Sequence, residues 1–321
     1  MNALSERERA HAGALRARGH GLPPEGAPGP DILDSWVRSA AAGLDLASAK
    51  AIPVLEAAQL KRRRDAVEPV RRLALAELET LMQQIAGSNY LLAFADRDGV
   101  VLDLYADARF RSSGRGDEVG LVAGSVWSEA EAGTNGLGTA LVTGHSVSVT
   151  GLEHYFLRYA DIACAAAPIR DAHGEVVGAL DASSYFESRQ RHTQALVQMS
   201  ATHIENLLLV QQMSGDIVLA LHPRQEFLGT LSAALLAIDA HGCISAFNAR
   251  AASLLTGLNL ARGIAFDAVF DEPYARLVSR LRPGAELRLR DALGSIVHAG
   301  LVHAPIGLLQ PRPALRLPLE A

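Results

Sequence analysis

Residues 127–141 constrain the fold of this chain most, because their glycines surround a pair of helix-capping residues. The stretch reads WSEAEAGTNGLGTAL, and glycine lets a backbone turn tightly where other residues cannot. Thr134 or Asn135 can cap a helix that begins at this turn. Apolar residues continue the helical pattern up to Gly144, which predicts the end of the helix. The stretch is therefore a loop that leads into a short helix.

Three predicted strands follow this helix, at residues 146–150, 162–169 and 175–184. The last two flank residues 170–174, whose turn formers between apolar runs predict a hairpin. Between the first two strands lies the segment 151–156, GLEHYF, which places an acid, an imidazole and two aromatic rings side by side. A connecting segment of this composition can close a pocket.

Two further strands are predicted at residues 90–95 and 100–105, and the Asp-Gly pair in the turn between them is a strong hairpin signal. Apolar residues recur at three- and four-residue steps over residues 67–85 and again over residues 187–213. This spacing predicts helices before and after the strands. We therefore predict an α+β domain with an antiparallel sheet flanked by helices.

Several spaced motifs resemble those of the GAF sensory domain at the front of acetoin-regulator-type (AcoR-like) activators, which work with the sigma-54 form of bacterial RNA polymerase. They are W-x-E-x-x-x-G-T-N-x-x-G-T-A-L at 127–141, G-x-E-H-Y at 151–155, C-A-A-A-P-I at 164–169 and G-A-L-D at 178–181. Upstream, S-W-V-R at 35–38 and G-L-D at 43–45 also resemble this family. The resemblance implies a GAF fold in a homodimeric sensor. It also implies that a full-length protein carries an ATPase domain and meets RNA polymerase and DNA, none of them bound directly by this chain.

Residues beyond 213 resemble the front of a PAS domain, in which an asparagine such as Asn248 follows the second strand. Strands are expected at 234–239, 243–247, 286–290 and 295–303, so a smaller PAS-like α+β domain follows the GAF domain. The predicted parts are a flexible N-terminal segment (1–30), a helical N-terminal extension (31–64), a GAF domain with long terminal helices (65–213), a PAS-like domain (226–303) and an irregular tail (304–321).

Composition argues against several classes of function. No apolar run approaches the ~18 residues of a membrane span, and the charged start MNALSERERA is unlike a signal peptide, which predicts a cytoplasmic protein without a membrane partner. The net charge of -5 gives no overall attraction to nucleic acid. The sequence contains no G-x-x-x-x-G-K-[ST] phosphate loop and no Cys-x-x-Cys or His-Glu-x-x-His motif. We expect no enzymatic activity and no catalytic residue. We also expect no metal or cofactor, because the spacing of His154, Glu153 and Asp161, which could hold a metal ion, is not diagnostic of such a site.

The candidate site combines apolar walls with a few polar groups, as small-molecule pockets require. Its predicted ligand-binding residues are Trp127, Asn135, His145, His154, Tyr155, Phe156, Cys164 and Asp181. Some of them also have a purely structural interpretation, since Asn135 can simply cap a helix, Trp127 can anchor the core and Cys164 can pack in it. His154 and Tyr155 have the best case as ligand contacts, because a core has no obvious need for them.

Three hypotheses about function follow. In the first, the chain senses a small organic effector, such as a hydroxyketone, alcohol, diol, ketone or small aromatic compound, and relays binding through dimer helices. This requires residues 153–156 to roof a hollow, and an inward Asp181 must be hydrogen-bonded to a ligand hydroxyl or a backbone group. In the second, the chain is a ligand-free dimerisation and protein-interaction module. In the third, the basic residues at 61–72 contact DNA, although Asp65 and Glu68 interrupt the positive charge.

Overall fold

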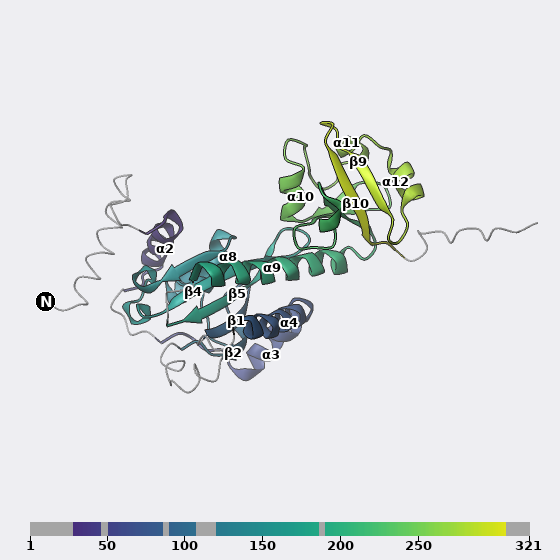
Figure 1. Ribbon diagram of the computed structural model, residues 1–321. Coiled ribbons are helices and arrows are strands. Elements are labelled where there is room, and N and C mark those ends of the chain that lie inside the picture. The colour runs from purple at the N-terminus through teal and green to yellow at the C-terminus, as the bar shows by residue number, and fades with distance from the viewer. Residues whose placement is uncertain (1–27, 46–50, 86–89, 107–119, 186–189, 306–321) are drawn as a thin grey trace, which may run out of the picture. The chain divides into compact units, whose positions relative to one another are not determined.

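The computed structural model describes residues 28–45, 51–85, 90–106, 120–185 and 190–305. The chain forms two compact units (Figure 1). The first comprises residues up to Asp171 and Glu175–Glu205, and the second comprises Ala172–Gly174 and the chain from Asn206 on. The segments predicted to be flexible or irregular, 1–30 and 304–321, lie almost wholly outside the described residues. Within the described ranges, no helix is both long enough and apolar enough to cross a bilayer.

The first unit is built on a five-stranded antiparallel sheet with the order β2-β1-β5-β4-β3. Its strands are β1 (Tyr90–Asp96), β2 (Val101–Ala106), β3 (Val147–Thr150), β4 (Ala163–Arg170) and β5 (Val176–Ser184). Both predicted hairpins are present, since β1 pairs with β2 and β4 pairs with β5. The predicted antiparallel α+β fold of this unit is confirmed.

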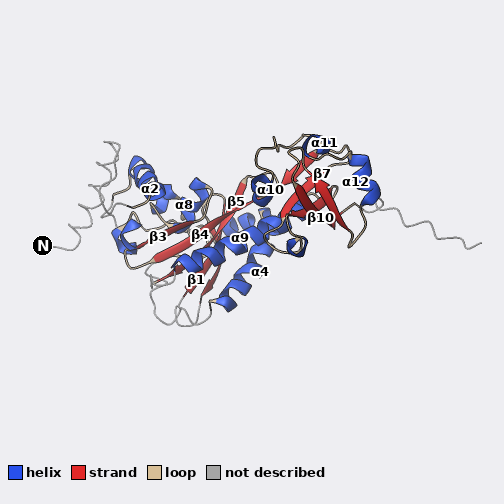
Figure 2. Cartoon of the chain, turned by 45° about the horizontal axis from the view of Figure 1, so that its top comes forward, coloured by secondary structure: helices blue, strands red, loops and turns tan. Residues whose placement is uncertain are grey.

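Helices cover both faces of this sheet (Figure 2). On one face lie α4 (Glu68–Gln84) and α9 (Gln190–Gln212), and on the other lie α2 (Pro30–Ala41) and α8 (Gly136–Thr143), with the short α7 (Glu129–Ala132) against α2. Side chains alternate along a strand, so β1 directs Leu91, Ala93 and Ala95 into the core beneath α2 and α8. That core also holds Trp36 of α2.

The helix predicted over residues 67–85 is present as α4, and a separate helix precedes it. The structure has α3 (Ala57–Ala66) and α4, with Val67 between them. Pro69 occupies the first turn of α4, where its missing N–H group costs the helix nothing. The apolar seam of α4 is buried as predicted, through Val70, Ala74, Leu78 and Leu81.

Strand pairing brings polar side chains of the candidate site together. Asp181 on β5 lies opposite Ala93 of β1 and Ala166 of β4, and Ser183 lies opposite Cys164. Because Asp181 and Ser183 are two residues apart, their side chains point to the same face of the sheet. This is the face that α8 covers.

The second unit is also α+β, with a five-stranded antiparallel sheet in the order β8-β7-β6-β10-β9. Its elements are β6 (Ile217–His222), β7 (Ala234–Ile238), β8 (Ile244–Phe247), α10 (Ala249–Leu254), α11 (Phe266–Val269), α12 (Tyr274–Arg280), β9 (Glu286–Arg290) and β10 (Ile296–His303). Asn248 caps α10, since its side chain accepts a hydrogen bond from the Ala251 N–H group at 2.9 Å. Strand β6 precedes the predicted start of the PAS-like domain and was not expected.

Candidate functional site

A small cavity lies in the first unit, between the N-terminal end of α8, the sheet and the segment that follows β3. That segment contains two short 3-10 helices, η1 (Gly151–Glu153) and η2 (Leu157–Tyr159). The polar lining residues are Asn135, His154, Cys164, Asp181 and Ser183. The cavity volume is about 20 Å³, which admits one water molecule, since the minimum for a water is ~10–15 Å³. A larger ligand therefore requires the lining to move apart.

Five of the eight predicted site residues line this cavity, namely Trp127, Asn135, His154, Cys164 and Asp181. Tyr155 and Phe156 are buried, but they pack in the surrounding core and do not line the cavity. His145 is exposed on the surface, where its Nε2 atom lies 3.5 Å from a carboxylate oxygen of Asp31. It follows the C-terminal end of α8, whereas the cavity is at the N-terminal end. The geometry therefore removes His145 from the proposed lining.

The sequence did not point to six of the lining residues, which are Leu121, Gly136, Leu137, Tyr159, Ile162 and Ser183. Ser183 carried a usable signal, because a residue two positions after Asp181 in a strand shares its face. The apolar members look like any other core residues in sequence. Among the described residues, no group of three or more His, Cys, Asp or Glu side chains is arranged to hold a metal ion.

Asn135 fixes the loop at the N-terminal end of α8. Its Oδ1 atom accepts a hydrogen bond from the Gly138 N–H group at 2.9 Å. Its Nδ2 atom donates to the carbonyl oxygens of Trp127 at 3.1 Å and Gly133 at 2.7 Å. Both amide N–H donors are thereby used. Asn135 is thus the helix cap, and it shapes the cavity wall without offering a free donor.

A row of polar contacts crosses the wall from η1 to β5. His154 Nδ1 lies 3.1 Å from the Gly151 carbonyl oxygen, which can only accept, so Nδ1 carries the proton and Nε2 is the acceptor. Nε2 lies 3.4 Å from Cys164 Sγ, which lies 3.2 Å from Ser183 Oγ. The Ser183 hydroxyl donates to Asp181 Oδ2 at 2.6 Å. The other carboxylate oxygen, Oδ1, has no hydrogen-bond partner among the described residues, although the residue is only 2% exposed.

Burial shifts the pKa values of His154, Cys164 and Asp181 so that the uncharged form of each side chain is favoured. Desolvation lowers the pKa of His154 to about 4 and raises the pKa of Asp181 to about 7. Desolvation also raises the pKa of the Cys164 thiol, and the charge of Asp181 raises it further. The imidazole and the thiol are therefore uncharged at neutral pH, whereas Asp181 changes its charge near pH 7.

Buried polar contacts fasten α2 to the loop before α8. Arg38 donates two hydrogen bonds to the Glu129 carboxylate, from Nε to Oε2 at 2.5 Å and from Nη2 to Oε1 at 2.8 Å. These bonds raise the pKa of the guanidinium group. Ser35 Oγ lies 2.6 Å from Glu129 Oε1 and 2.7 Å from Thr134 Oγ1. Glu129 is thus the centre of the contact between α2 and the loop.

Two further hydrogen bonds fasten the N-terminal part of the unit to the segment after β3. Trp36 donates its indole N–H to the carbonyl oxygen of Glu153 at 2.8 Å. The Tyr155 hydroxyl donates to the carbonyl oxygen of Leu44 at 2.9 Å. Any outward movement of the segment that carries His154 therefore changes the contacts of α2.

Replacing Glu129 with alanine is expected to destabilise the first unit by about 2 kcal/mol and to loosen α2. The change removes the partner of Arg38 and Ser35, but Arg38 keeps 36% of its side chain in water, so the loss falls below the ~3–5 kcal/mol of a fully buried pair. Amide hydrogen exchange within α2 measures the loosening. The exposed pair of Lys61 and Asp65 gives a matched control, since Asp65→Ala should cost less than ~1 kcal/mol. Equal effects of the two variants would contradict this account.

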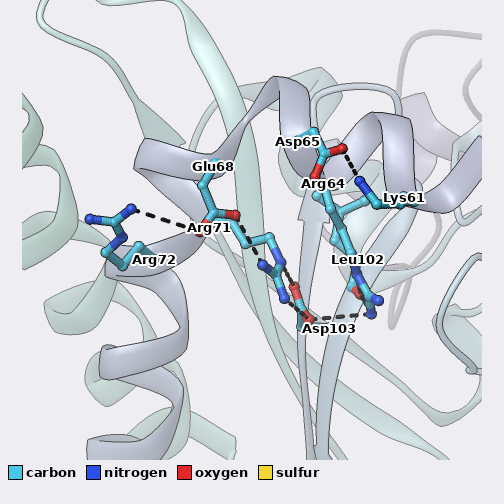
Figure 3. Close-up of polar contacts among 8 residues, drawn as sticks. All are labelled: Lys61, Arg64, Asp65, Glu68, Arg71, Arg72, Leu102 and Asp103. Carbon is cyan, nitrogen blue, oxygen red and sulfur yellow. Dashed lines mark hydrogen bonds and ion pairs between the residues drawn. The ribbon is translucent and has the colours of Figure 1, made fainter.

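The basic residues of α3 and α4 are largely occupied by acidic and carbonyl groups of the same unit (Figure 3). Arg71 contacts Asp103 at 2.6 Å and Glu68 at 3.0 Å. Arg64 donates to the carbonyl oxygen of Leu102 and lies 3.3 Å from Asp103. A DNA phosphate would have to compete with these carboxylates, so the contacts favour a structural role for this basic stretch.

A family model described as the MimR N-terminal domain matches residues 13–205, more than half of the chain. The chain belongs to this family. The acetoin catabolism regulatory protein of Cupriavidus necator is 32% identical over 231 residues, which cover 70% of this chain and 34% of that protein. The acetoin dehydrogenase operon activator AcoR of Bacillus subtilis is 32% identical over 152 residues, 47% of this chain and 25% of that protein. The propane 2-monooxygenase operon activator MimR of Mycolicibacterium goodii is 29% identical over 181 residues, which cover 56% of this chain and 30% of that protein.

These relatives of the MimR N-terminal domain confirm the resemblance to acetoin-regulator-type activators, and they are transcriptional regulators, not enzymes. The chain spans about a quarter to a third of their length. It therefore corresponds to a regulatory N-terminal domain of transcriptional activators. In a crystal structure of the E. coli DhaR(N)-DhaL complex, a chain of 18% identity superposes with a TM-score of 0.54 over 86% of this chain and 99% of its own length, which supports the fold alone.

Proposed function

We propose that the chain is the signal-sensing region of a sigma-54-dependent activator and that its cavity binds a small uncharged effector, such as a hydroxyketone, alcohol, diol, ketone or small aromatic compound. One observation carries the proposal: Asp181 Oδ1 is buried at an otherwise largely apolar cavity and has no hydrogen-bond partner among the described residues. An unpaired buried polar atom costs roughly 1–3 kcal/mol, so a ligand group that bonds to it gains affinity. The similarity to regulators named for acetoin fits a ligand of this size.

Binding of such an effector would have to widen the cavity, because about 20 Å³ does not hold several heavy atoms. The segment of η1 and η2 is the wall best able to move, since it is a connection and not part of the sheet. Trp36 and Tyr155 tie this segment to α2 and to Leu44, so its displacement would reach the N-terminal part of the unit. In a full-length homodimer, the change would pass through the long helices to an ATPase domain acting with RNA polymerase at DNA.

The affinity should be modest. At a ceiling of ~1.5 kcal/mol per heavy atom, an effector of about six heavy atoms gains at most ~9 kcal/mol, which corresponds to roughly micromolar binding. The work of widening the cavity subtracts from this value. We therefore expect dissociation constants weaker than micromolar.

A thermal-shift screen of the intact chain tests the sensory proposal, because a ligand that binds only the folded state raises the melting temperature. The compounds are acetoin, butane-2,3-diol, butan-2-ol, butan-2-one and phenol. At a hundredfold excess over Kd, binding adds ~2.7 kcal/mol, which corresponds to a rise of roughly 5–10 °C in a unit of this size. No rise with any of these compounds would count heavily against the proposal.

The variant Gly136→Ala tests whether a compound binds in this cavity. A Cβ atom at this position would lie 2.5 Å from Asp181 Oδ1 and 2.8 Å from Cys164 Cβ, so it would crowd the polar corner. We expect the ligand-induced shift to disappear, with a destabilisation of ~1–3 kcal/mol from overpacking. Gly215→Ala is the matched control, since a Cβ atom there meets nothing within 4 Å. A shift that persists in Gly136→Ala would place the ligand elsewhere.

A protein-interaction module is the second candidate, and a separate observation favours it. The structural neighbour DhaR(N) was solved as a complex with DhaL, so a related fold can present a binding surface for a protein. A ligand-free module of this kind would form a stable dimer in light scattering and would show no thermal shift with the five compounds.

A further inference from the structure

The polar groups around the cavity differ in whether a ligand can use them. Asn135 donates both amide N–H groups to backbone carbonyl oxygens. His154 donates from Nδ1 to a carbonyl and turns Nε2 to Cys164. The Ser183 hydroxyl donates to Asp181. These contacts leave Asp181 Oδ1 as the side-chain acceptor that no described residue satisfies.

The Tyr159 hydroxyl is a second buried atom on the wall without a well-formed hydrogen bond. The Arg158 guanidinium carbon lies 4.8 Å from the centre of the Tyr159 ring, and its charge acts on the hydroxyl. The Tyr159 hydroxyl therefore already has a charged group, the Arg158 guanidinium, close to it. Among the described lining residues there is no cation beside Asp181 Oδ1, so this atom depends more strongly on a ligand.

The position of Asp181 Oδ1 is fixed by its surroundings. The Ser183 hydroxyl holds Oδ2 at 2.6 Å, and β5 lies between β1 and β4 in the sheet. On the other side, Gly136 begins α8, and even a methyl group there would collide with Oδ1. The carboxyl group therefore presents one oxygen in one direction, close to the N-terminal end of a helix, where an acceptor is favoured.

The charges of the lining restrict the ligand that can reach this oxygen. No lysine or arginine is among the described residues that line the cavity, so an effector carboxylate would face Asp181 without a counter-charge from them. An ammonium group would bring three N–H donors to two unpaired side-chain acceptors, Asp181 Oδ1 and the Tyr159 hydroxyl, and would leave a donor unsatisfied. A hydroxyl group brings one donor to one acceptor. Uncharged ligands with a hydroxyl group therefore match the site best.

We infer that Asp181 anchors the effector and that its Oδ1 atom accepts a hydrogen bond from a hydroxyl group of an uncharged ligand. The cavity thus selects alcohols, diols and hydroxyketones over simple ketones and carboxylates. This inference rests on the proposed sensory function and names the ligand group that the site recognises. A ketone oxygen and an ionised carboxylate are both acceptors, so they cannot form a hydrogen bond and they repel each other. A protonated carboxyl group, in contrast, can donate a hydrogen bond to a ketone oxygen. The other titratable groups of the described lining are Cys164, His154 and Tyr159, and all three are uncharged at neutral pH because burial raises the pKa of the thiol and the phenol and lowers that of the imidazole. The charge of Asp181 therefore sets the preference.

Calorimetric titration of the intact chain with two matched pairs tests the inference. Butan-2-ol and butan-2-one form one pair, and acetoin and butane-2,3-dione form the other, so that the members of each pair differ in one hydroxyl group. At pH 8 we expect the hydroxyl compound to bind about 10- to 100-fold more tightly, as for other hydrogen bonds to a charged group. At pH 5.5, where Asp181 is protonated and can donate, the ratio should fall to about threefold or less.

The variant Asp181→Asn isolates the carboxyl group. Its amide keeps an oxygen for the Ser183 hydroxyl and turns N–H donors to the ligand, which suit a ketone and an alcohol alike. We expect the alcohol and the ketone of each pair to bind this variant with a ratio of dissociation constants near 1 at both pH values. Asp161→Asn is the matched control, because Asp161 is an exposed acid just after η2 and does not line the cavity. It should keep the wild-type preference and its pH dependence.

An undiminished preference in Asp181→Asn would overturn the inference and leave the sensory proposal standing, because the compounds would still bind. The same holds if the wild-type protein binds both members of each pair equally at pH 8, or binds butan-2-amine or butanoate more tightly than butan-2-ol. If none of these compounds binds the wild-type protein, the inference and the sensory proposal both fail. Asp181 Oδ1 then serves a structural water only.

Discussion

Replacing Gly133 with alanine is expected to destabilise the first unit by about 4 kcal/mol. Gly133 has φ 64° and ψ -163°, a conformation that residues with a Cβ atom adopt only at a cost of ~1–3 kcal/mol. The added Cβ atom would also lie 2.5 Å from Tyr155 Cβ, and overpacking of this kind adds ~1–3 kcal/mol. Tyr155 cannot easily retreat, because its N–H donates to the Thr134 carbonyl and its hydroxyl donates to the Leu44 carbonyl.

Thermal unfolding measures this effect as a fall of about 10 °C in the melting temperature of the first unit. Gly43→Ala is the control for an alanine at a positive φ without a collision, because Gly43 has φ 78° and an added Cβ atom there meets nothing within 4 Å. We expect the control to cost only about 1 kcal/mol. If the two variants lose the same stability, the packing of Tyr155 against the loop is not as close as the structure has it.

Asp181→Asn is expected to stabilise the ligand-free protein at pH 8 by about 4 kcal/mol, although it abolishes the discrimination between ligands. Burial raises the pKa of Asp181 from its ordinary value of 3.8 to about 7. Between these values the folded chain holds a proton that the unfolded chain has already released, so the stability of the wild type falls as the pH rises from about 4 to 7. The full cost, about 4 kcal/mol, is present above pH 7, and the amide does not incur it.

The measurement is the free energy of unfolding of both proteins in denaturant at several pH values. The difference should be within about 1 kcal/mol at pH 4.5, where both side chains are neutral in the folded chain, and should grow up to pH 7. The comparison must be between variant and wild type, because His154 acts in the opposite direction. Its lowered pKa makes the folded chain lose stability as the pH falls from about 6.5 to 4. A difference that does not vary with pH would show that Asp181 is not desolvated as the structure requires.

The order of elements in the first unit could be predicted because its local signals are strong. The turn after β1 contains Asp98 and Gly99, Asn135 caps α8, and Gly144 ends it in a left-handed conformation. β6 gave no such signal. Its sequence, IVLALH, is a short apolar run after a long helix, and periodicity alone cannot assign such a run to a strand.

The candidate site could be predicted only where a side chain is unusual for a core, as with His154 and Asp181. Neighbours in sequence do not share a direction, so Tyr155 turns to Gly133 and Leu44 while His154 lines the cavity. The position of His145 depends on which end of α8 meets the cavity, which is a tertiary property. The hydrogen bond from Ser183 to Asp181 follows from strand alternation only once the inward face is known.

The contacts of α2 also determine when this helix can pack during synthesis of the chain. Trp36 and its partner Glu153 are 117 positions apart. At a synthesis rate of ~5–20 residues per second, roughly 6–25 s pass between the synthesis of α2 and that of Glu153. Until then Ile32, Leu33 and Trp36, which are buried in the finished unit, lack much of the surface that covers them. During these seconds the apolar face of α2 is more exposed to solvent than it is in the finished unit.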